Sequence, residues 1–195
     1  MIKITIATED ILSEKIVIKL INEFDKFEVI NSLGKKGNGY IFKNIKKFHQ
    51  LSFSQSVLIV LDLDNRHDVK MFANEVIGCI KINKNLKLSI SVREIESWLL
   101  ADKEGMSDFL QISKDKIPVN PELLLDPKEE IIKLAKKGKN TRTKNGIPPQ
   151  KGAISKMGLS YNTLLTEFVE NIWSSDRAKN NSASLRDILS ILKEM

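Results

Sequence analysis

One short apolar run constrains the fold more than any other feature of the sequence. Val57–Leu61 consists of five consecutive apolar residues, several of them β-branched, and it is too short for a buried helix, so it predicts a strand. Because no polar residue interrupts the run, both faces of that strand must be covered, as in a parallel sheet between helices. The run ends in Asp62 and Asp64, which predicts two carboxylates at the carboxyl end of a central strand.

Strand-like and helix-like patterns alternate around this run. Strands are predicted at 2–6, 27–30, 57–61 and 86–92, and amphipathic helices at 10–24, 40–50, 66–80 and 94–101. Parallel strands need crossover connections, which these helices supply. The predicted fold class is therefore α/β, with a Rossmann-like, mostly parallel sheet flanked by helices over residues 1–103.

The remaining residues are helical and loop-rich. Asp126–Glu129 is a typical helix start, because its first carboxylate caps free amides and its proline fits the first turn. Residues 138–158 carry glycines, prolines and cations and predict a long loop. We expect residues 104–195 to form a helical extension packed on the 1–103 core.

Charge is unevenly distributed along the chain. The formal net charge is +6 at pH 7, from 31 Lys and Arg against 25 Asp and Glu. Residues 133–156 carry eight cations and no acid, and residues 29–61 carry five lysines and no acid. Such segregation is typical of a polyanion-binding surface, although solvated loops of a lysine-rich protein give the same composition. The predicted nucleic-acid contacts are Lys136, Lys137, Lys139, Arg142, Lys144 and Lys151.

Several classes of protein are excluded. No apolar run approaches the roughly 20 residues of a membrane span, and the N-terminus lacks a signal-peptide pattern. The single Cys79 excludes an intrachain disulfide and a multi-cysteine metal site, so a cytoplasmic protein is expected. The glycine loop 34–39 lacks the Lys-Ser/Thr of a phosphate-binding Walker loop, and no Gly-x-Ser-x-Gly elbow is present. The lysines of that loop either contact phosphate or belong to a plain turn.

Acidic residues follow three of the predicted strands. In open α/β sheets, ligands bind outside the carboxyl ends of the strands, so we expect these residues to converge on one cleft. Carboxylate oxygens without His or Cys suit Mg²⁺ or Mn²⁺, although loops after strands also carry stray acids. The predicted catalytic and metal-binding residues are Glu9, Asp62, Asp64, Glu94 and Glu96. Arg93 and Lys128 are expected either to orient these carboxylates or to form simple salt bridges.

These motifs resemble a known family. Asp62-Leu-Asp64 after an apolar strand, with Glu9 after the first strand, resembles the Toprim domain of topoisomerases, primases and OLD-type nucleases. Longer strings across most of the chain are similar to a Toprim-like family of uncharacterised bacterial proteins. They include Glu9–Glu14, Val57–Asp64, Val92–Asp102, Asp126–Lys128, Gly158–Asn162, Phe168–Val169 and Ser184–Arg186.

The resemblance implies a Mg²⁺-dependent enzyme acting on phosphodiesters of nucleic acid, in a process such as phage defence or DNA repair. By position, Glu9 would be the general acid/base or a ligand, and Asp62 and Asp64 the metal ligands. Glu94 or Glu96 would match the additional acid of the OLD-type two-metal arrangement. Toprim proteins usually have glycine after the first glutamate, which lets the backbone approach the substrate, whereas this chain has Asp10. The alternative is a non-catalytic module that binds nucleic acid or a partner ATPase.

Overall fold

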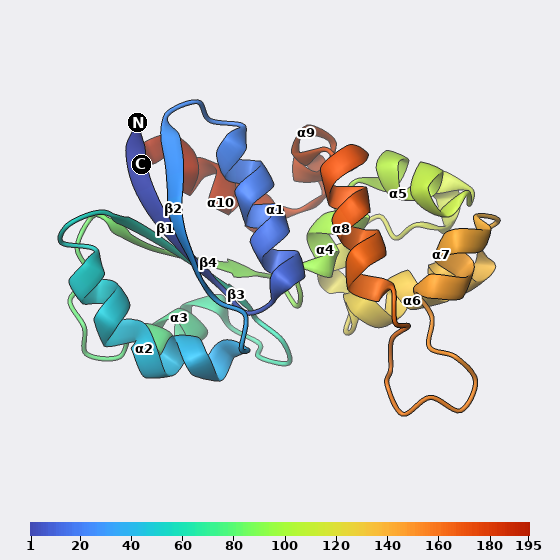
Figure 1. Cartoon of the computed structure of the whole chain (residues 1–195), viewed down its shortest axis with the longest axis horizontal. Helices are drawn as coiled ribbons and strands as arrows, with labels where there is room; N and C mark the ends of the chain where they lie inside the picture. The colour runs from blue at the N-terminus through green and yellow to red at the C-terminus, as the bar shows by residue number, and fades with distance from the viewer. The chain divides into compact units, whose positions relative to one another are not determined.

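The computed structural model describes all 195 residues and divides the chain into two compact units (Figure 1). The first unit comprises Met1–Val92 together with Arg186–Met195, and the second comprises Arg93–Leu185. The division differs from the expected boundary at residue 103, because the second unit begins directly after the last strand and the end of the chain belongs to the first unit.

Four parallel strands form the sheet of the first unit. In chain order they are β1 (Ile2–Thr8), β2 (Phe27–Gly34), β3 (Ser56–Asp62) and β4 (Leu86–Ser91). Their order in the sheet is β2-β1-β3-β4, and all three pairs are parallel. The predicted α/β class is confirmed. Because the strand order reverses between β1 and β3, the carboxyl ends of these two strands form a topological switch point, where ligands of such sheets bind.

Three helices connect these strands. They are α1 (Ile11–Asn22), α2 (Asn38–Leu51) and α3 (Val69–Ile77), and the end of α10 (Ala183–Glu194) also belongs to this unit. Figure 1 shows α2 and α3 on one face of the sheet and α1 on the other. The helix expected at 66–80 begins later, because the Asp68 carboxylate caps it by accepting the Met71 N–H at 2.8 Å.

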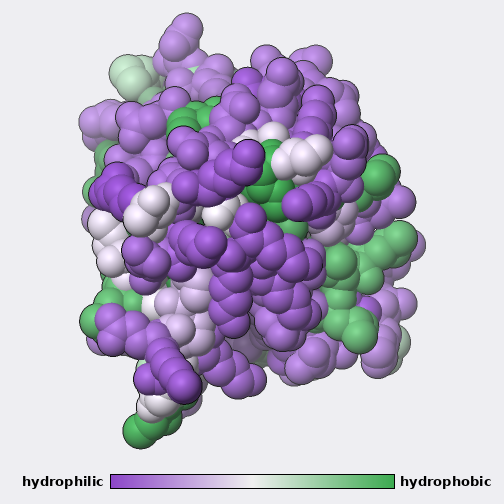
Figure 2. Space-filling model, turned by 90° about the vertical axis from the view of Figure 1, so that its right-hand side faces the viewer, coloured by the Kyte–Doolittle hydropathy of each residue, from purple (hydrophilic) through white to green (hydrophobic).

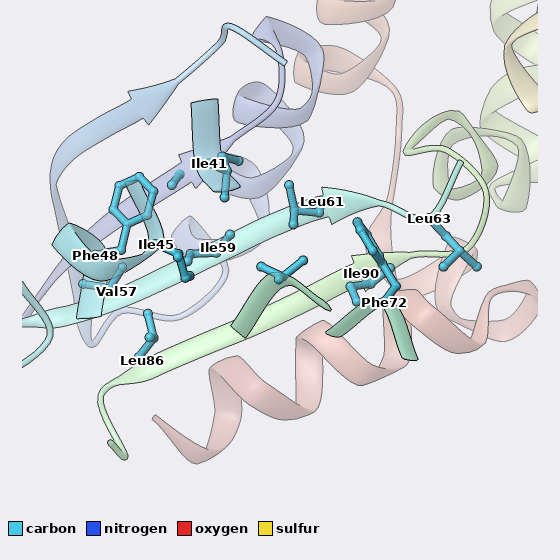
Figure 3. Packing of buried hydrophobic residues seen from close by; sticks show 12 residues of the cluster. Ile41, Ile45, Phe48, Val57, Ile59, Leu61, Leu63, Phe72, Leu86 and Ile90 are labelled. Atoms are coloured by element: carbon cyan, nitrogen blue, oxygen red, sulfur yellow. The ribbon is translucent and has the colours of Figure 1, made fainter. Parts of the chain in front are cut away.

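The core of the first unit confirms that β3 is covered on both faces. Val57, Ile59 and Leu61 pack with side chains of α2 and α3 in one buried cluster (Figure 3). Leu58 and Val60, which alternate with them along the strand, are equally buried. Every side chain of the continuous apolar run Val57–Leu61 is therefore buried.

The second unit is helical, as the pattern predicts. Its α-helices are α4 (Glu96–Ala101), α5 (Lys103–Leu110), α6 (Pro127–Lys137), α7 (Thr141–Gly146), α8 (Tyr161–Asn171) and α9 (Ser175–Ala178), with 3-10 turns at Lys114–Lys116, Pro121–Leu123 and Lys179–Asn181. Two buried tryptophans connect parts of this core through hydrogen bonds. Trp173 Nε1–H donates to the carbonyl of Trp98 at 2.9 Å, and Trp98 Nε1–H donates to Ser184 Oγ at 2.7 Å.

The long loop predicted over 138–158 is wrong in its first part. Helix α7 forms there because the Asn140 side chain accepts the N–H groups of Arg142 and Thr143 at 3.0 and 3.4 Å, and because Thr143 is buried. The irregular segment that remains begins at Ile147. No helix of the chain is both long enough and apolar enough to cross a membrane.

Candidate active site

Glu9 and Asp62 meet at the switch point of the sheet. Glu9 follows β1 directly, and Asp62 is the last residue of the neighbouring strand β3. The backbone N–H of Asp62 donates a hydrogen bond to Glu9 Oε1 at 2.9 Å. The structure therefore brings together two residues that the sequence predicts for the site.

The glycine loop helps to hold Glu9 in place. Gly37 N–H donates to the Glu9 carbonyl at 3.0 Å, and Lys35 N–H donates to the Thr8 carbonyl at 2.9 Å. Gly34 has a left-handed φ of 100°, and a Cβ at this position would lie only 2.1 Å from the Thr8 oxygen. Glycine is thus required here by close packing against the end of β1.

The surroundings of Glu9 favour its protonated form. Burial of the carboxyl group, the largest influence, raises its pKa, and the N–H of Asp62 acts in the opposite direction. The negative charges of Asp64 and Asp10 raise it further, against the positive charge of Arg66, and the pKa of Glu9 reaches about 7. A carboxyl group that exchanges its proton near neutral pH is suited to general acid–base chemistry.

The chain bends immediately after Asp62. β3 ends at this residue, Leu63 turns into the core, and Asp64 has a left-handed backbone with φ of 52°. Strand alternation therefore does not force the two aspartates onto opposite sides of the sheet. Asp62 Oδ1 accepts a hydrogen bond from Ser91 Oγ, and Asp64 lies 3.8 Å from the Arg66 guanidinium.

Asp10, the residue after Glu9, caps helix α1. Its carboxylate accepts the Ser13 N–H at 2.8 Å. Its φ of −143° is extended backbone that any residue adopts, so the aspartate introduces no strain.

Glu94 and Glu96 belong to the second unit, where Lys128 joins them. The Lys128 N–H donates to Glu94 Oε2 at 3.0 Å, and its Nζ lies 3.5 Å from Glu96 Oε1 and 3.9 Å from Glu94 Oε1. Glu96 is only 1% exposed, and its Oε1 also accepts the hydroxyl of Tyr161 at 3.0 Å. Lys128 is therefore placed to orient both carboxylates. Arg93, just before them, has a left-handed φ of 63°.

The five predicted acids thus form two sets, three in the first unit and two in the second. Their convergence on one cleft stays a prediction. No group of three or more His, Cys, Asp or Glu side chains is arranged to hold a metal ion. Mg²⁺, however, is usually bound through one or two carboxylates, with water and substrate phosphates completing its shell. The oxygen donors Asp62 and Asp64 fit an open site of this kind.

The predicted basic contacts are distributed over different parts of the second unit. Lys136 lines a cavity of about 460 Å³ together with Glu94, Lys128 and Lys156. Lys137 and Lys139 line another cavity of about 530 Å³ with Lys116. The face of the molecule shown in Figure 2 is mostly hydrophilic, as expected for a surface rich in lysine.

Arg142 differs from the other predicted contacts. Both of its terminal nitrogens donate to the Glu167 carboxylate, at 2.5 and 2.6 Å. These hydrogen bonds and the charge of Glu167 raise the pKa of Arg142 above its ordinary value. The positive charge of Arg142 is thus already paired with the negative charge of Glu167.

Three neighbours of the acids are absent from the sequence prediction. Ser91 lies opposite Asp62 in the register of β3 and β4, and local sequence pattern does not supply that register. Arg66 stacks on Phe72, with its guanidinium 4.0 Å from the ring centre, and lies 3.5 Å from Glu75. Tyr161 is 65 residues from Glu96, and no local pattern links the two.

Comparison with protein-family models, with curated proteins and with solved structures found no match. The function has to be inferred from these residues themselves.

Proposed function

We propose that this chain is a cytoplasmic nuclease, or a related phosphoryl-transfer enzyme, that depends on Mg²⁺ or Mn²⁺ and acts on nucleic acid. One observation carries the proposal. Glu9, whose pKa is raised to about 7, accepts the backbone N–H of Asp62 at 2.9 Å at the carboxyl ends of two neighbouring parallel strands. A proton-exchanging carboxyl group is thereby held beside two hard oxygen ligands at the edge of the sheet where ligands bind.

The charges around Glu9 support a cation at this place. Asp64 and Asp10 both act on Glu9 with negative charge and raise its pKa, and the opposing effect of the positive charge of Arg66 is smaller than either. Asp62 and Asp64 would hold the metal ion. When bound, Mg²⁺ would supply a Lewis acid for a phosphate oxygen and lower the pKa of bound water.

The protein's own residues have separate tasks in this proposal. Glu9 would take a proton from the attacking water or give one to the leaving oxygen, because it titrates near neutral pH. Ser91 fixes the Asp62 carboxylate through its hydroxyl, and Arg66 lies beside Asp64. The Gly37 N–H anchors the backbone of Glu9.

The cations of the second unit support nucleic acid as the substrate. Lys136, Lys137, Lys139, Lys144 and Lys151 would hold the sugar-phosphate backbone without reading the sequence. Arg142 is left out of this set because Glu167 already binds it. Glu94 and Glu96 would take part in the reaction as additional acids.

The test is cleavage of labelled single-stranded and duplex DNA and RNA by the full chain, with Mg²⁺, Mn²⁺ or EDTA. We expect metal-dependent cleavage that falls by roughly 100-fold or more in Asp62→Asn and Glu9→Gln, the usual scale for losing an acid–base group. Asp25→Asn is the matched control, because Asp25 is exposed and precedes β2, at the amino ends of the strands rather than at their carboxyl ends. Undiminished cleavage by both site variants would overturn the proposal. Binding without cleavage under every metal condition would identify a non-catalytic module instead.

A further inference from the structure

The segment between α7 and α8 is a closed loop with a fixed base. The N–H of Gly158 donates to the Ile147 carbonyl at 2.8 Å. A Cβ at Gly158 would lie 2.2 Å from the Gly146 oxygen and 2.5 Å from the Pro148 oxygen, so only glycine fits. Residues 147–158, the stapled loop, therefore form a compact loop with adjoining ends, a type that is frequently functional. It projects from the second unit below α6 and α7 in Figure 1.

One large apolar side chain, that of Ile154, is exposed at the tip of the stapled loop. Ala153 N–H donates to the Gln150 carbonyl at 3.0 Å, and Ser155 exchanges hydrogen bonds of 2.8 and 3.2 Å with Met157. Between these turns lies Ile154, which is 104% exposed, the largest fraction among the exposed large apolar residues of the chain.

The charge around this tip selects a polyanion. Lys151 and Lys156 flank Ile154, and no Asp or Glu occurs between Glu130 and Glu167. A lipid surface shares the negative charge but needs a broad apolar face, and the tip offers a single isoleucine. DNA fits both features, because apolar wedges enter between its base steps while cations meet its phosphates.

The inner side of the stapled loop leads towards the acids of the second unit. Pro149, Lys156 and Met157 line the cavity of about 460 Å³ whose wall also contains Glu94 and Lys128. A strand held by the tip would therefore continue past a carboxylate–lysine pair.

We propose that the stapled loop is a DNA wedge, in which Ile154 enters a base step of a duplex while Lys151 and Lys156 hold the flanking phosphates. This rests on the proposed function for its nucleic-acid substrate and adds that the protein unstacks duplex DNA. Only the phosphate contacts contribute to the dependence of affinity on salt, which separates the two kinds of contact.

The test uses duplex DNA carrying single 2-aminopurine bases, whose fluorescence rises on unstacking, with the full chain in EDTA so that metal-dependent cleavage does not interfere. We expect the wild type to raise the fluorescence at one step. Ile154→Ser should abolish that rise and weaken binding by about 10-fold, with an unchanged salt slope, because the apolar contact between the isoleucine and the bases is lost. Lys151→Ala should keep the rise and flatten the slope by about 0.9. Leu159→Ser, at an apolar residue 94% exposed just beyond the loop, is the matched control.

Several outcomes would overturn the wedge. One is duplex binding without a fluorescence rise, and another is a rise that Ile154→Ser leaves unchanged or that Leu159→Ser removes equally. Tighter, Ile154-dependent binding to duplex RNA or to anionic vesicles would also refute DNA as the partner of the loop. The proposed nuclease function is judged separately by metal-dependent cleavage in Glu9 and Asp62 variants, so each proposal can fail alone.

Discussion

The hydroxyl of Ser91 donates a hydrogen bond to the Asp62 carboxylate from the register position directly opposite it on the neighbouring strand. Hydrogen bonds of this kind orient metal-binding carboxylates, and their loss typically lowers metal affinity by about 10- to 100-fold. We therefore expect Ser91→Ala to shift the Mg²⁺ midpoint of cleavage upward by about that factor while the maximal rate changes less. Ser89→Ala, on the same strand and also buried, is the matched control. Equal midpoints in the wild type and Ser91→Ala would show that Asp62 does not bind the metal.

The stability of the protein should depend on pH through Glu9. Its pKa is about 7 in the folded chain against an ordinary 4.5, so the native state binds this proton more tightly than the unfolded state. The stabilising contribution is fully present below pH 4.5 and is lost as the pH rises through about 7. Glu9→Gln should remove this decline, so that the variant gains stability relative to the wild type as the pH rises over that range.

Urea unfolding in EDTA at several pH values measures this dependence. Asp25→Asn, at an exposed carboxylate, should follow the wild-type curve. Parallel curves for the wild type and Glu9→Gln would contradict the raised pKa.

The sequence predicts all four strands because their patterns follow from packing that is local along the chain. The continuous run at Val57–Leu61 requires cover on both faces and receives it. β2 extends to Gly34, beyond the predicted end, because its last residues pair with β1 although Asn31 and Ser32 are polar. The sequence pattern does not predict helix α7, because most residues of this helix are polar and its stability depends on the Asn140 cap.

The candidate site is predictable only where chemistry and strand position coincide. Glu9 and Asp62 follow adjacent parallel strands, so the topology brings them together once the strands are assigned. Ser91 requires the register of β3 with β4, which local pattern does not supply. Tyr161 reaches Glu96 through tertiary packing of helices far apart in the sequence, where no period or spacing gives a signal.

Asp102, which is buried, and Arg177, whose side chain is 40% exposed, should stabilise the second unit. Asp102 is fully buried and accepts Arg177 Nε and Nη2, both at 2.7 Å, together with the N–H groups of Ser174 and Gly105. Asp102→Ala leaves these donors without their acceptor, so we expect a loss of about 2 kcal/mol in the free energy of unfolding. Asp108→Ala, at an exposed acid of the same region, should cost less than about 0.5 kcal/mol. Similar urea midpoints for both variants would contradict this assignment.

The predicted convergence of the two acid sets is tested by Glu94→Gln. If Glu94 contributes to the same metal-dependent reaction as Asp62, its loss should lower cleavage by at least about 100-fold, the smaller end of acid–base effects. Glu129→Gln is the control, because Glu129 lines the same cavity but is exposed and pairs with Lys133 at 3.2 Å. Normal cleavage by Glu94→Gln would confine the reaction to the carboxylates of the first unit.

The cations of the second unit should differ in their contribution to nucleic-acid binding. We expect the lysines to contribute and Arg142 not to contribute. Each lysine that neutralises a duplex phosphate contributes about 0.9 to the slope of log K against log salt. Replacing Lys136, Lys137 and Lys139 together with alanine should flatten that slope by about 2.7, because three such contacts are lost. Arg142→Ala should leave it nearly unchanged, since both terminal nitrogens of this side chain already donate to the Glu167 carboxylate. Exposed lysines contribute little to folding, so the triple variant should unfold at the wild-type urea concentration. The opposite result would contradict this assignment. If Arg142→Ala flattens the salt slope, Glu167 must release Arg142 to the nucleic acid. If the triple substitution leaves the salt slope unchanged, the three lysines are only solvated.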